Sequence, residues 1–399
     1  MNKKKRIYLD YSATTPMDPR VIDVMCDFMG KKFGNPSSLH SFGRDARREV
    51  EKARSKCIDF IGADNPSEII FNSGGTESDN LVLEGIINGT KEKIPHIITT
   101  SIEHKAVLEK LKDLEGQGLV KATYLRVDKY GQISIDTLKK EIKENTVLVS
   151  IMYANNEIGT VQPIREVGKF LEKLNKKRKK EGMPRIYLHT DAVQAFAYLP
   201  CNVKYLHVDL MSISSHKIYG PKGVGFLYVK ENTPLKHNIV GGAQEFKKRA
   251  GTENTTSIIG LSKAIELLEF EQKEDDKKIK NLRNKLIEGV AKIPNVYLTG
   301  HPKERLPNLA SFIFQGIEGE SILINLDLEG VAVSTGSACT SGTLAMSHVL
   351  SACEYNPQEA QGNIRFSLGR FTTEEEINRV LEVLPSIISK LRNISPISK

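Results

Sequence analysis

Short apolar segments alternate with longer amphipathic segments through the middle of the chain. The apolar segments predict strands, and the amphipathic segments between them predict helices; the strands are 69–71, 96–100, 121–125, 147–152, 186–190 and 208–213, and the helices are 76–88, 104–114, 135–143 and 163–179. Strands separated by helices of this length are typical of parallel βα units. The pattern therefore predicts an α/β fold built on a doubly wound, mostly parallel sheet.

The pattern changes after Gly260. A long charged helix over 261–293 is followed by shorter strands and two helices; the strands are 296–298, 311–314, 331–334 and 364–367, and the helices are 320–328 and 374–391. We expect the short strand and turn at 7–16 to join this part. The sequence thus predicts a large domain over 16–260 and a smaller α+β domain made of 1–15 and 261–399.

Composition and charge narrow the class of protein. The chain has 399 residues and 39% hydrophobic content, which is enough for a large core. It contains no apolar run of about eighteen residues, so no membrane span is expected. The start lacks the apolar core of a signal peptide, which predicts a cytoplasmic location. The net charge of +8 comes largely from short basic runs near the start and at 173–180. Such runs are typical of solvated faces, so direct nucleic-acid binding is not expected.

The five cysteines are widely spaced and form no CxxC pair; they are residues 26, 57, 201, 339 and 353. This spacing argues against a disulfide framework and against a structural zinc site. Cys57 and Cys26 are predicted to be buried on helices. Cys339 differs because it lies in a run of small residues, 334–342, that is poorly suited to pack a core. We therefore predict a mobile loop with a reactive thiol at Cys339.

Polar residues follow several predicted strands at their carboxyl ends, where open α/β sheets form their sites. Gly75 and Thr76 open a helix, and a helix N-terminus can bind phosphate, although the same residues suit a plain turn. His104 opens the next helix, either as a cap or as a ring that stacks on a flat cofactor. Asn155 supplies an amide at a further strand end.

Asp191 and Lys217 are the most informative strand-end residues. A carboxylate that ends an apolar strand needs a cationic partner, for which a protonated pyridine nitrogen is suited, unless Asp191 caps a helix. A lysine held beside an apolar strand can form a Schiff base with an aldehyde, although an ordinary strand-end lysine looks the same. Together with the phosphate-binding turn and His104, these residues indicate a pyridoxal phosphate site.

On these residues the chain resembles the cysteine desulfurases of the NifS/IscS type, in the class V aminotransferase group of fold type I pyridoxal phosphate enzymes. The resemblance extends over nearly the whole chain through ordered motifs, among them 8–16, 34–36, 73–78, 103–107, 155–159, 191–194, 214–217, 249–254, 334–341 and 364–370.

The resemblance implies a role for each candidate residue. Lys217 would carry the cofactor, His104 would stack on its ring, Asp191 would pair with the ring nitrogen, and Gln194 would bond the phenolic oxygen. The residues implied to bind the phosphate are Gly75, Thr76, Ser214, Ser215 and His216. Thr252 would reach the phosphate of the partner subunit, which implies a homodimer. Asn155 would contact the cofactor and, together with Arg365, would hold the substrate carboxylate. The forked guanidinium of Arg365 suits a carboxylate better than an ammonium group does.

The implied reaction takes sulfur from L-cysteine, giving L-alanine and a persulfide on Cys339, with His104 handling the thiol proton. The sulfur would pass to an acceptor such as an iron–sulfur scaffold protein or to tRNA thiolation. The family also suggests Cys339 as a ligand shared with a nascent iron–sulfur cluster. Ala243 and Phe246 depart from the glycine and arginine that the family usually carries, and the basic run 173–180 is longer than usual.

Other functions fit parts of the pattern. A selenocysteine lyase, another β-lyase or a small-substrate transaminase would use the same cofactor residues. Cys339 separates these enzymes from a desulfurase, because simple elimination needs no enzymic thiol. An inactive paralogue that serves as a binding protein is the alternative outside enzymes. Intact Lys217, Asp191 and Arg365 argue against it.

Overall fold

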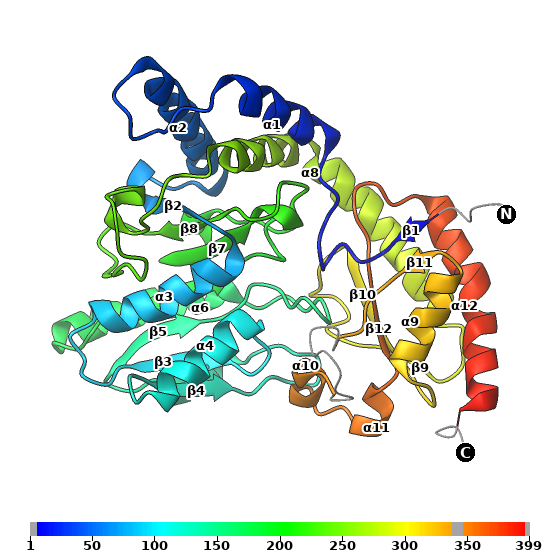
Figure 1. Cartoon of the computed structure of the whole chain (residues 1–399). Coiled ribbons are helices and arrows are strands. Elements are labelled where there is room, and N and C mark those ends of the chain that lie inside the picture. Colours follow the sequence, from blue (N-terminus) through cyan, green and yellow to red (C-terminus); the bar gives the residue numbers. More distant parts are fainter. Residues whose placement is uncertain (1–5, 337–345, 396–399) are drawn as a thin grey trace.

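The computed structural model describes residues 6–336 and 346–395. Its centre is a seven-stranded sheet in the order β2-β8-β7-β6-β5-β3-β4 (Figure 1). The strands are β2 (Ile69–Asn72), β3 (His96–Thr100), β4 (Lys121–Leu125), β5 (Thr146–Ser150), β6 (Tyr187–Asp191), β7 (Leu210–Ser214) and β8 (Gly225–Val229). The five adjacent strands β7, β6, β5, β3 and β4 pair in parallel. The strand β8 is antiparallel to both β2 and β7. The prediction of a mostly parallel α/β sheet is confirmed.

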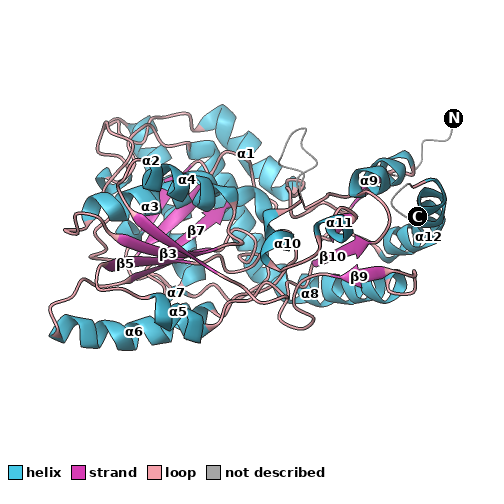
Figure 2. Cartoon of the chain, turned by 90° about the horizontal axis from the view of Figure 1, so that it is seen from below, coloured by secondary structure: helices cyan, strands magenta, loops and turns pink. Residues whose placement is uncertain are grey.

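Helices connect these strands and cover the sheet. They are α3 (Gly75–Gly89), α4 (Lys105–Gly116), α5 (Ile135–Glu141), α6 (Ile164–Lys180) and the short α7 (Val203–Leu206). The helices α3 and α4 lie on one side of the sheet, and α5, α6 and α7 lie on the other (Figure 2). The basic run 173–180 forms the end of α6 and is largely exposed, but Arg178 within it is buried and donates to backbone carbonyls such as Glu144 O.

A second, smaller group of strands lies beside this sheet (Figure 1). The strands β9 (Val296–Leu298), β10 (Leu309–Phe314) and β12 (Asn363–Ser367) form an antiparallel sheet. The strand β1 (Ile7–Tyr8) pairs in parallel with β11 (Val331–Ala332), so the start of the chain lies among its last elements. The accompanying helices are α9 (Gly319–Leu328), α10 (His348–Ala352), α11 (Pro357–Ala360) and α12 (Glu374–Ile394).

The long helix α8 (Thr255–Val290) joins the two parts, and α1 (Pro19–Lys31) and α2 (Ser41–Ile61) pack on its first half. It begins six residues before the predicted start, because Asn254 caps it by accepting the N–H of Ser257. Leu261 belongs to the core of the large sheet and Leu286 to the core of the small sheet. We propose that the chain divides into the two domains that the sequence predicts and that α8 is shared between them.

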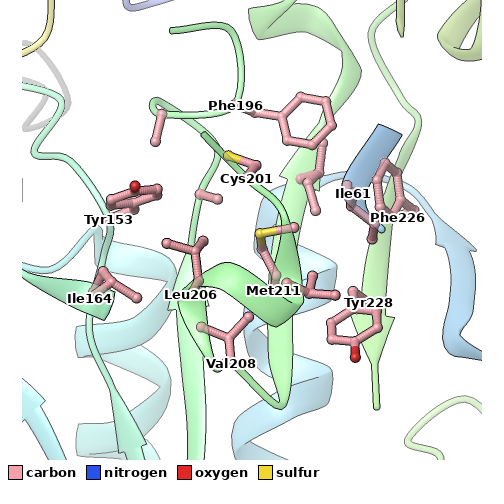
Figure 3. Close-up of a cluster of buried hydrophobic side chains, with 14 of the residues drawn as sticks. Ile61, Tyr153, Ile164, Phe196, Cys201, Leu206, Val208, Met211, Phe226 and Tyr228 are labelled. Atoms are coloured by element: carbon pink, nitrogen blue, oxygen red, sulfur yellow. The ribbon is translucent and has the colours of Figure 1, made fainter. Parts of the chain in front are cut away.

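The core of the large sheet settles two predictions about cysteines. Aromatic side chains such as Phe196 and Phe226 fill it together with Met211, and Cys201 packs among them (Figure 3). Cys57 is fully buried, as predicted. The prediction that Cys26 is buried is wrong, because Cys26 is exposed. It lies two residues before the buried Phe28, more than half a helical turn away from the face that α1 turns to the core.

Candidate active site

Lys217 lies at the carboxyl end of β7, in a single 3₁₀ turn, Ser215–Lys217. Its Nζ donates hydrogen bonds to the carbonyl oxygens of Ser12 (2.5 Å) and Ala13 (2.8 Å). The side-chain amide of Gln194 donates to the same Ser12 oxygen at 2.9 Å. The N-terminal segment 10–15 therefore brings Lys217 and Gln194 together. The sequence motifs contained this segment, but nothing in their local pattern indicated the contact.

His104 and Asp191 complete an electrostatic cluster with Lys217. Asp191 is the last residue of β6, and burial raises the pKa of its carboxyl, while His104 and Lys217 act in the opposite direction. Burial lowers the pKa of His104, which Asp191 raises and Lys217 lowers further. Asp191 and His104 thus each respond to the other and to Lys217, as expected of residues around one ligand.

The sequence also allowed Asp191 and His104 to be helix caps, and the structure shows that only His104 is one. Residues 193–198 form turns, so Asp191 caps no helix; its Oδ1 accepts the N–H of Val193 at 2.9 Å. His104 does cap α4, because its Nδ1 accepts the N–H of Ala106 at 3.1 Å. That bond fixes the ring without preventing it from stacking on a ligand.

The start of α3 forms a backbone turn suited to an anion. Gly74 has φ 139°, a conformation that other residues rarely adopt, and it precedes the first helical residue, Gly75. A Cβ atom on Gly75 would lie 2.9 Å from Val193 Cγ2, and one on Gly74 would lie 3.3 Å from Ser214 Oγ. The space at the helix N-terminus is therefore open only because both residues are glycines.

The other predicted phosphate residues differ in their exposure and in the contacts they make. Thr76 is exposed in the first turn of α3. His216 bonds Thr14 Oγ1 through its Nδ1 at 3.1 Å, and burial lowers the pKa of His216 to about 4. Ser215 Oγ is buried without a hydrogen-bond partner among the described residues, and a Cβ on Gly220 would lie 2.1 Å from it. The Ser215 hydroxyl therefore packs against the following turn, away from the glycines of α3.

Arg365 lies on β12, on the side of the site formed by the small sheet. Its guanidinium is nearly buried, pairs with Asp10 Oδ1 at 2.7 Å and donates to Asn156 O at 2.8 Å. Its Nε has no hydrogen-bond partner among the described residues. Asp10, for which the sequence predicted no role, holds the arginine in place, while the Nε–H has no partner among the described residues.

Asn155 shapes the loop that Arg365 contacts. Its side-chain Oδ1 accepts the N–H groups of Glu157 (2.8 Å) and Ile158 (3.0 Å), and its Nδ2 donates to Ile102 O (3.0 Å). Both polar atoms of the amide are thus engaged by the backbone. The side chain supports the site through this loop in the structure.

The segment 10–15 connects the two sides of the site. Asp10 pairs with Arg365, the N–H of Ser12 donates to Ser367 Oγ on β12, and Thr15 bonds the carbonyl of His216. Arg365 and Lys217, which are far apart in sequence, are therefore tied to the same short stretch of backbone.

Thr252 is exposed in the loop that precedes α8. An ion pair between Arg54 and Glu245, nearly buried on both sides, anchors this loop with two 2.9 Å hydrogen bonds. Phe246, one of the departures from the family pattern, covers the Arg54 guanidinium at 5.1 Å, and Arg249 pairs with Glu77 in the first turn of α3.

Changing Glu245 to alanine is expected to lower the free energy of unfolding by about 3 kcal/mol, because the buried Arg54 would keep only the partly exposed Glu51 as a counter-charge. Urea denaturation measures this effect. Glu109→Ala, which removes an exposed ion pair with Lys112, is the matched control and should change stability by less than about 0.5 kcal/mol. Equal effects of the two variants would contradict the anchoring role.

Cys339 lies within residues 337–345, outside the described residues, and so do the predictions of its mobile loop and of a cluster ligand there. Glu157 contacts both described ends of that segment. Its Oε2 accepts a short hydrogen bond from the Ser347 hydroxyl, and a Cβ on Gly336 would lie 2.8 Å from the same oxygen. Burial raises the pKa of Glu157 to about 7, although Ser347 and Arg365 favour the ionised form.

This raised pKa predicts a pH-dependent stability. The folded protein holds the Glu157 proton more tightly than the unfolded chain does, so Glu157 weakens the fold as pH rises from its ordinary pKa of 4.5 through about 7. Glu157→Gln should therefore gain roughly 2 kcal/mol relative to wild type between about pH 5 and about pH 8. Urea denaturation at both pH values measures this, with exposed Glu382→Gln as the control. Parallel pH dependence of Glu157→Gln and wild type would contradict it.

Comparisons with known proteins agree with this geometry. The model of the class-V aminotransferase family matches residues 7–380. A cysteine desulfurase IscS of Methanosarcina thermophila is 48% identical over 99% of this chain and 95% of its own length. Another, from Dictyoglomus turgidum, is 50% identical over 98% and 97%. A solved NifS-like protein superimposes with a TM-score of 0.89 at 39% identity, covering 97% of this chain and all of that one.

The chain therefore belongs to the class-V aminotransferase family and, within it, to the cysteine desulfurases. The resemblance found in the sequence is confirmed, and with it pyridoxal phosphate as the cofactor of this enzyme family. The residues fit that cofactor, because a buried carboxylate at the end of β6, a lysine in the turn after β7 and a glycine turn at a helix N-terminus lie at the same edge of the sheet.

The described residues contain neither a helix suited to span a membrane nor a cluster suited to bind a metal ion. Over 6–336 and 346–395, no helix is both long enough and apolar enough to cross a membrane. Within the same ranges, no group of three or more histidine, cysteine or acidic side chains is arranged to hold a metal ion.

Proposed function

We propose that this protein takes sulfur from L-cysteine, releases L-alanine and carries the sulfur as a persulfide on Cys339. The relatives named cysteine desulfurase, which match almost the whole chain, support this activity. The observation that carries the proposal is the cluster of Lys217, Asp191 and His104, three groups that perturb one another's charge at the carboxyl end of the sheet.

The cofactor, when bound, supplies a conjugated ring that withdraws electrons from the substrate Cα. Lys217 Nζ holds the cofactor at rest and moves the proton at the substrate Cα. Asp191 holds the proton on the ring nitrogen, and Gln194, which shares the Ser12 carbonyl with Lys217, bonds the phenolic oxygen. His104 would stack on the ring and would manage the proton of the substrate thiol.

The start of α3 would hold the phosphate group of the cofactor. Gly75 offers its N–H at the helix N-terminus, and the hydroxyls of Thr76 and Ser214 flank the same turn. His216 adds a ring nitrogen. Ser215 offers no donor to the phosphate in this structure, because its N–H donates to Val224 O at 3.1 Å and its hydroxyl packs against Gly220.

Arg365 binds the substrate carboxylate. Its buried Nε has no partner among the described residues, and Asp10 keeps the guanidinium in a fixed plane. Asn155 supports this binding by shaping the loop whose Asn156 carbonyl accepts from Arg365. A fixed guanidinium suits a carboxylate better than an ammonium group would.

Cys339 accepts the sulfur. Its thiolate forms a bond to the substrate sulfur as the bond between that sulfur and carbon breaks. The electron pair of the broken bond stays with carbon, which takes up a proton to give alanine. The new persulfide is then available to an acceptor, which we propose is an iron–sulfur scaffold protein or a tRNA-thiolation factor.

We further propose that the protein acts as a homodimer in which Thr252 bonds the phosphate held by the partner subunit. The support is the loop that carries Thr252. It is exposed at Thr252, yet it is fixed to the fold by the Arg54–Glu245 pair and by Arg249. A rigid, exposed loop is suited to reach a second chain without losing its own order.

Product analysis tests the proposed activity. The purified protein is incubated anaerobically with L-cysteine and a reductant, and alanine, sulfide and pyruvate are quantified. A desulfurase gives equal amounts of alanine and sulfide without pyruvate. Sulfide with an equal amount of pyruvate would instead identify a β-lyase, and no product would identify an inactive paralogue.

A further inference from the structure

A buried row of polar side chains crosses the sheet behind the active site. It consists of Ser150 on β5, His189 on β6 and Ser212 on β7, all fully buried. His189 Nδ1 bonds Ser150 Oγ at 2.9 Å, and its Nε2 bonds Ser212 Oγ at 2.9 Å. Burial lowers the pKa of His189 to about 3, so this ring is neutral at physiological pH. The row carries hydrogen bonds but no positive charge.

Asp79 on α3 packs against this row. It is 1% exposed, and its Oδ1 lies 3.7 Å from His189 Nε2. The same Oδ1 has no hydrogen-bond partner among the described residues, and Ser212 is the side chain that interacts with the carboxyl. No role in the proposed reaction accounts for a carboxyl group in this position, and burying one without a counter-charge is costly.

Asp79 also faces Asp191. His189 and Asp191 are two residues apart on β6, so their side chains leave the same face of the sheet. Asp191 is the charged group that acts most strongly on Asp79, followed by Glu103, which is itself buried and bonded to Thr100 and to the backbone of Met152. Three carboxyl groups therefore share one region of low dielectric.

These three carboxyl groups cannot all be ionised, because like charges in a dry site repel strongly. Asp191 alone has His104 and Lys217 among the groups that favour its charge. The negative charge therefore resides on Asp191, and the protons are held by the neighbouring carboxyl groups. Burial and the charge of Asp191 both raise the pKa of Asp79 well above its ordinary value.

We propose that Asp79 is a positioning residue that acts in its protonated form, donating a hydrogen bond to the Ser212–His189 row and thereby keeping Asp191 ionised and in place for the ring nitrogen of the cofactor. This inference rests on the proposed function, since it concerns the residue that pairs with that nitrogen. It assigns a task to Asp79, His189 and Ser212, none of which touches the substrate.

The test compares Asp79→Asn with Asp79→Ala in the cofactor-loaded protein without substrate. Two readouts are used: the absorbance of the bound cofactor as a function of pH, and the dissociation constant for pyridoxal phosphate. Asparagine is neutral and donates as a protonated Asp79 would, so it should shift the titration midpoint by less than about 0.3 unit and change the dissociation constant by less than about 3-fold. Alanine should shift the midpoint by about one unit and weaken binding by about 10-fold.

A shift in Asp79→Asn as large as that in Asp79→Ala would overturn the proposal, because it would mean that Asp79 is ionised. Wild-type behaviour of Asp79→Ala would overturn it as well. Should Asp79→Ala fail to fold, Ser212→Ala takes its place, and an unchanged titration in that variant would count against the proposal. Failure of the proposed function would look different, because it would appear in the products that the wild type forms from L-cysteine, whereas this test compares cofactor titrations without substrate.

Discussion

Changing Lys217 to alanine is expected to abolish alanine formation from L-cysteine. The variant loses both the covalent attachment point of the cofactor and the base at the substrate Cα, and a general base alone contributes about 10²–10⁴-fold to a rate. Removing Nζ also removes the two hydrogen bonds to Ser12 and Ala13 that hold the N-terminal segment against the site. Steady-state alanine formation and the absorbance of the bound cofactor measure the two losses.

Lys230→Ala is the matched control for that variant. Lys230 is an exposed lysine that directly follows β8, so its removal should leave turnover and the cofactor spectrum as in wild type. Turnover by Lys217→Ala within about 10-fold of wild type would contradict the assignment, because neither role can be lost at so small a cost.

Changing Cys339 to alanine is expected to separate cofactor binding from sulfur transfer. Lys217, Asp191, His104 and the start of α3 remain intact, so the variant should bind pyridoxal phosphate and L-cysteine and show the wild-type spectrum. Without a thiolate to accept the sulfur, alanine formation should fall by at least about 10²-fold. Spectra with and without L-cysteine, together with alanine release, measure this.

Cys26→Ala is the control for Cys339→Ala. Cys26 is the exposed cysteine among the described residues, so it tests whether any accessible thiol can take the sulfur. The variant should retain full activity. Sulfide with pyruvate from Cys339→Ala at the wild-type rate would remove Cys339 from the reaction and identify an elimination.

The residues around the cofactor could be predicted because they follow strands of a parallel sheet. The apolar segments located the strands within a few residues, and parallel strands bring their carboxyl ends to one edge. Gly75, His104, Asp191 and Lys217 are spread over the chain, yet each follows or ends a strand at that edge. Their position at one edge of the sheet is thus a consequence of topology, which the order of predicted strands and helices is able to show.

Contacts made by single side chains across distant elements could not be predicted in this way. Two of these contacts depend on where the first residues of the chain lie against the large sheet. One is the Asp10–Arg365 pair, and the other is the Ser12 carbonyl, which accepts from both Gln194 and Lys217. The position of Asp79 behind Asp191 depends on how α3 packs on β6 and β7, since its place in the sequence suits an ordinary helix surface. The error at Cys26 arose similarly, because hydrophobic neighbours did not reveal which face of α1 turns inward.

The most direct measurement is mass spectrometry of the cysteine-containing peptides after one addition of L-cysteine to the anaerobic protein. Alkylation before digestion preserves a persulfide, and Lys217→Ala treated in parallel shows what forms without catalysis. The account predicts one added sulfur atom on Cys339 in the wild type, none on Cys26, and none on either residue in Lys217→Ala. Release of alanine and sulfide by the wild type with Cys339 unmodified throughout, or sulfur on Cys26 instead, would contradict it.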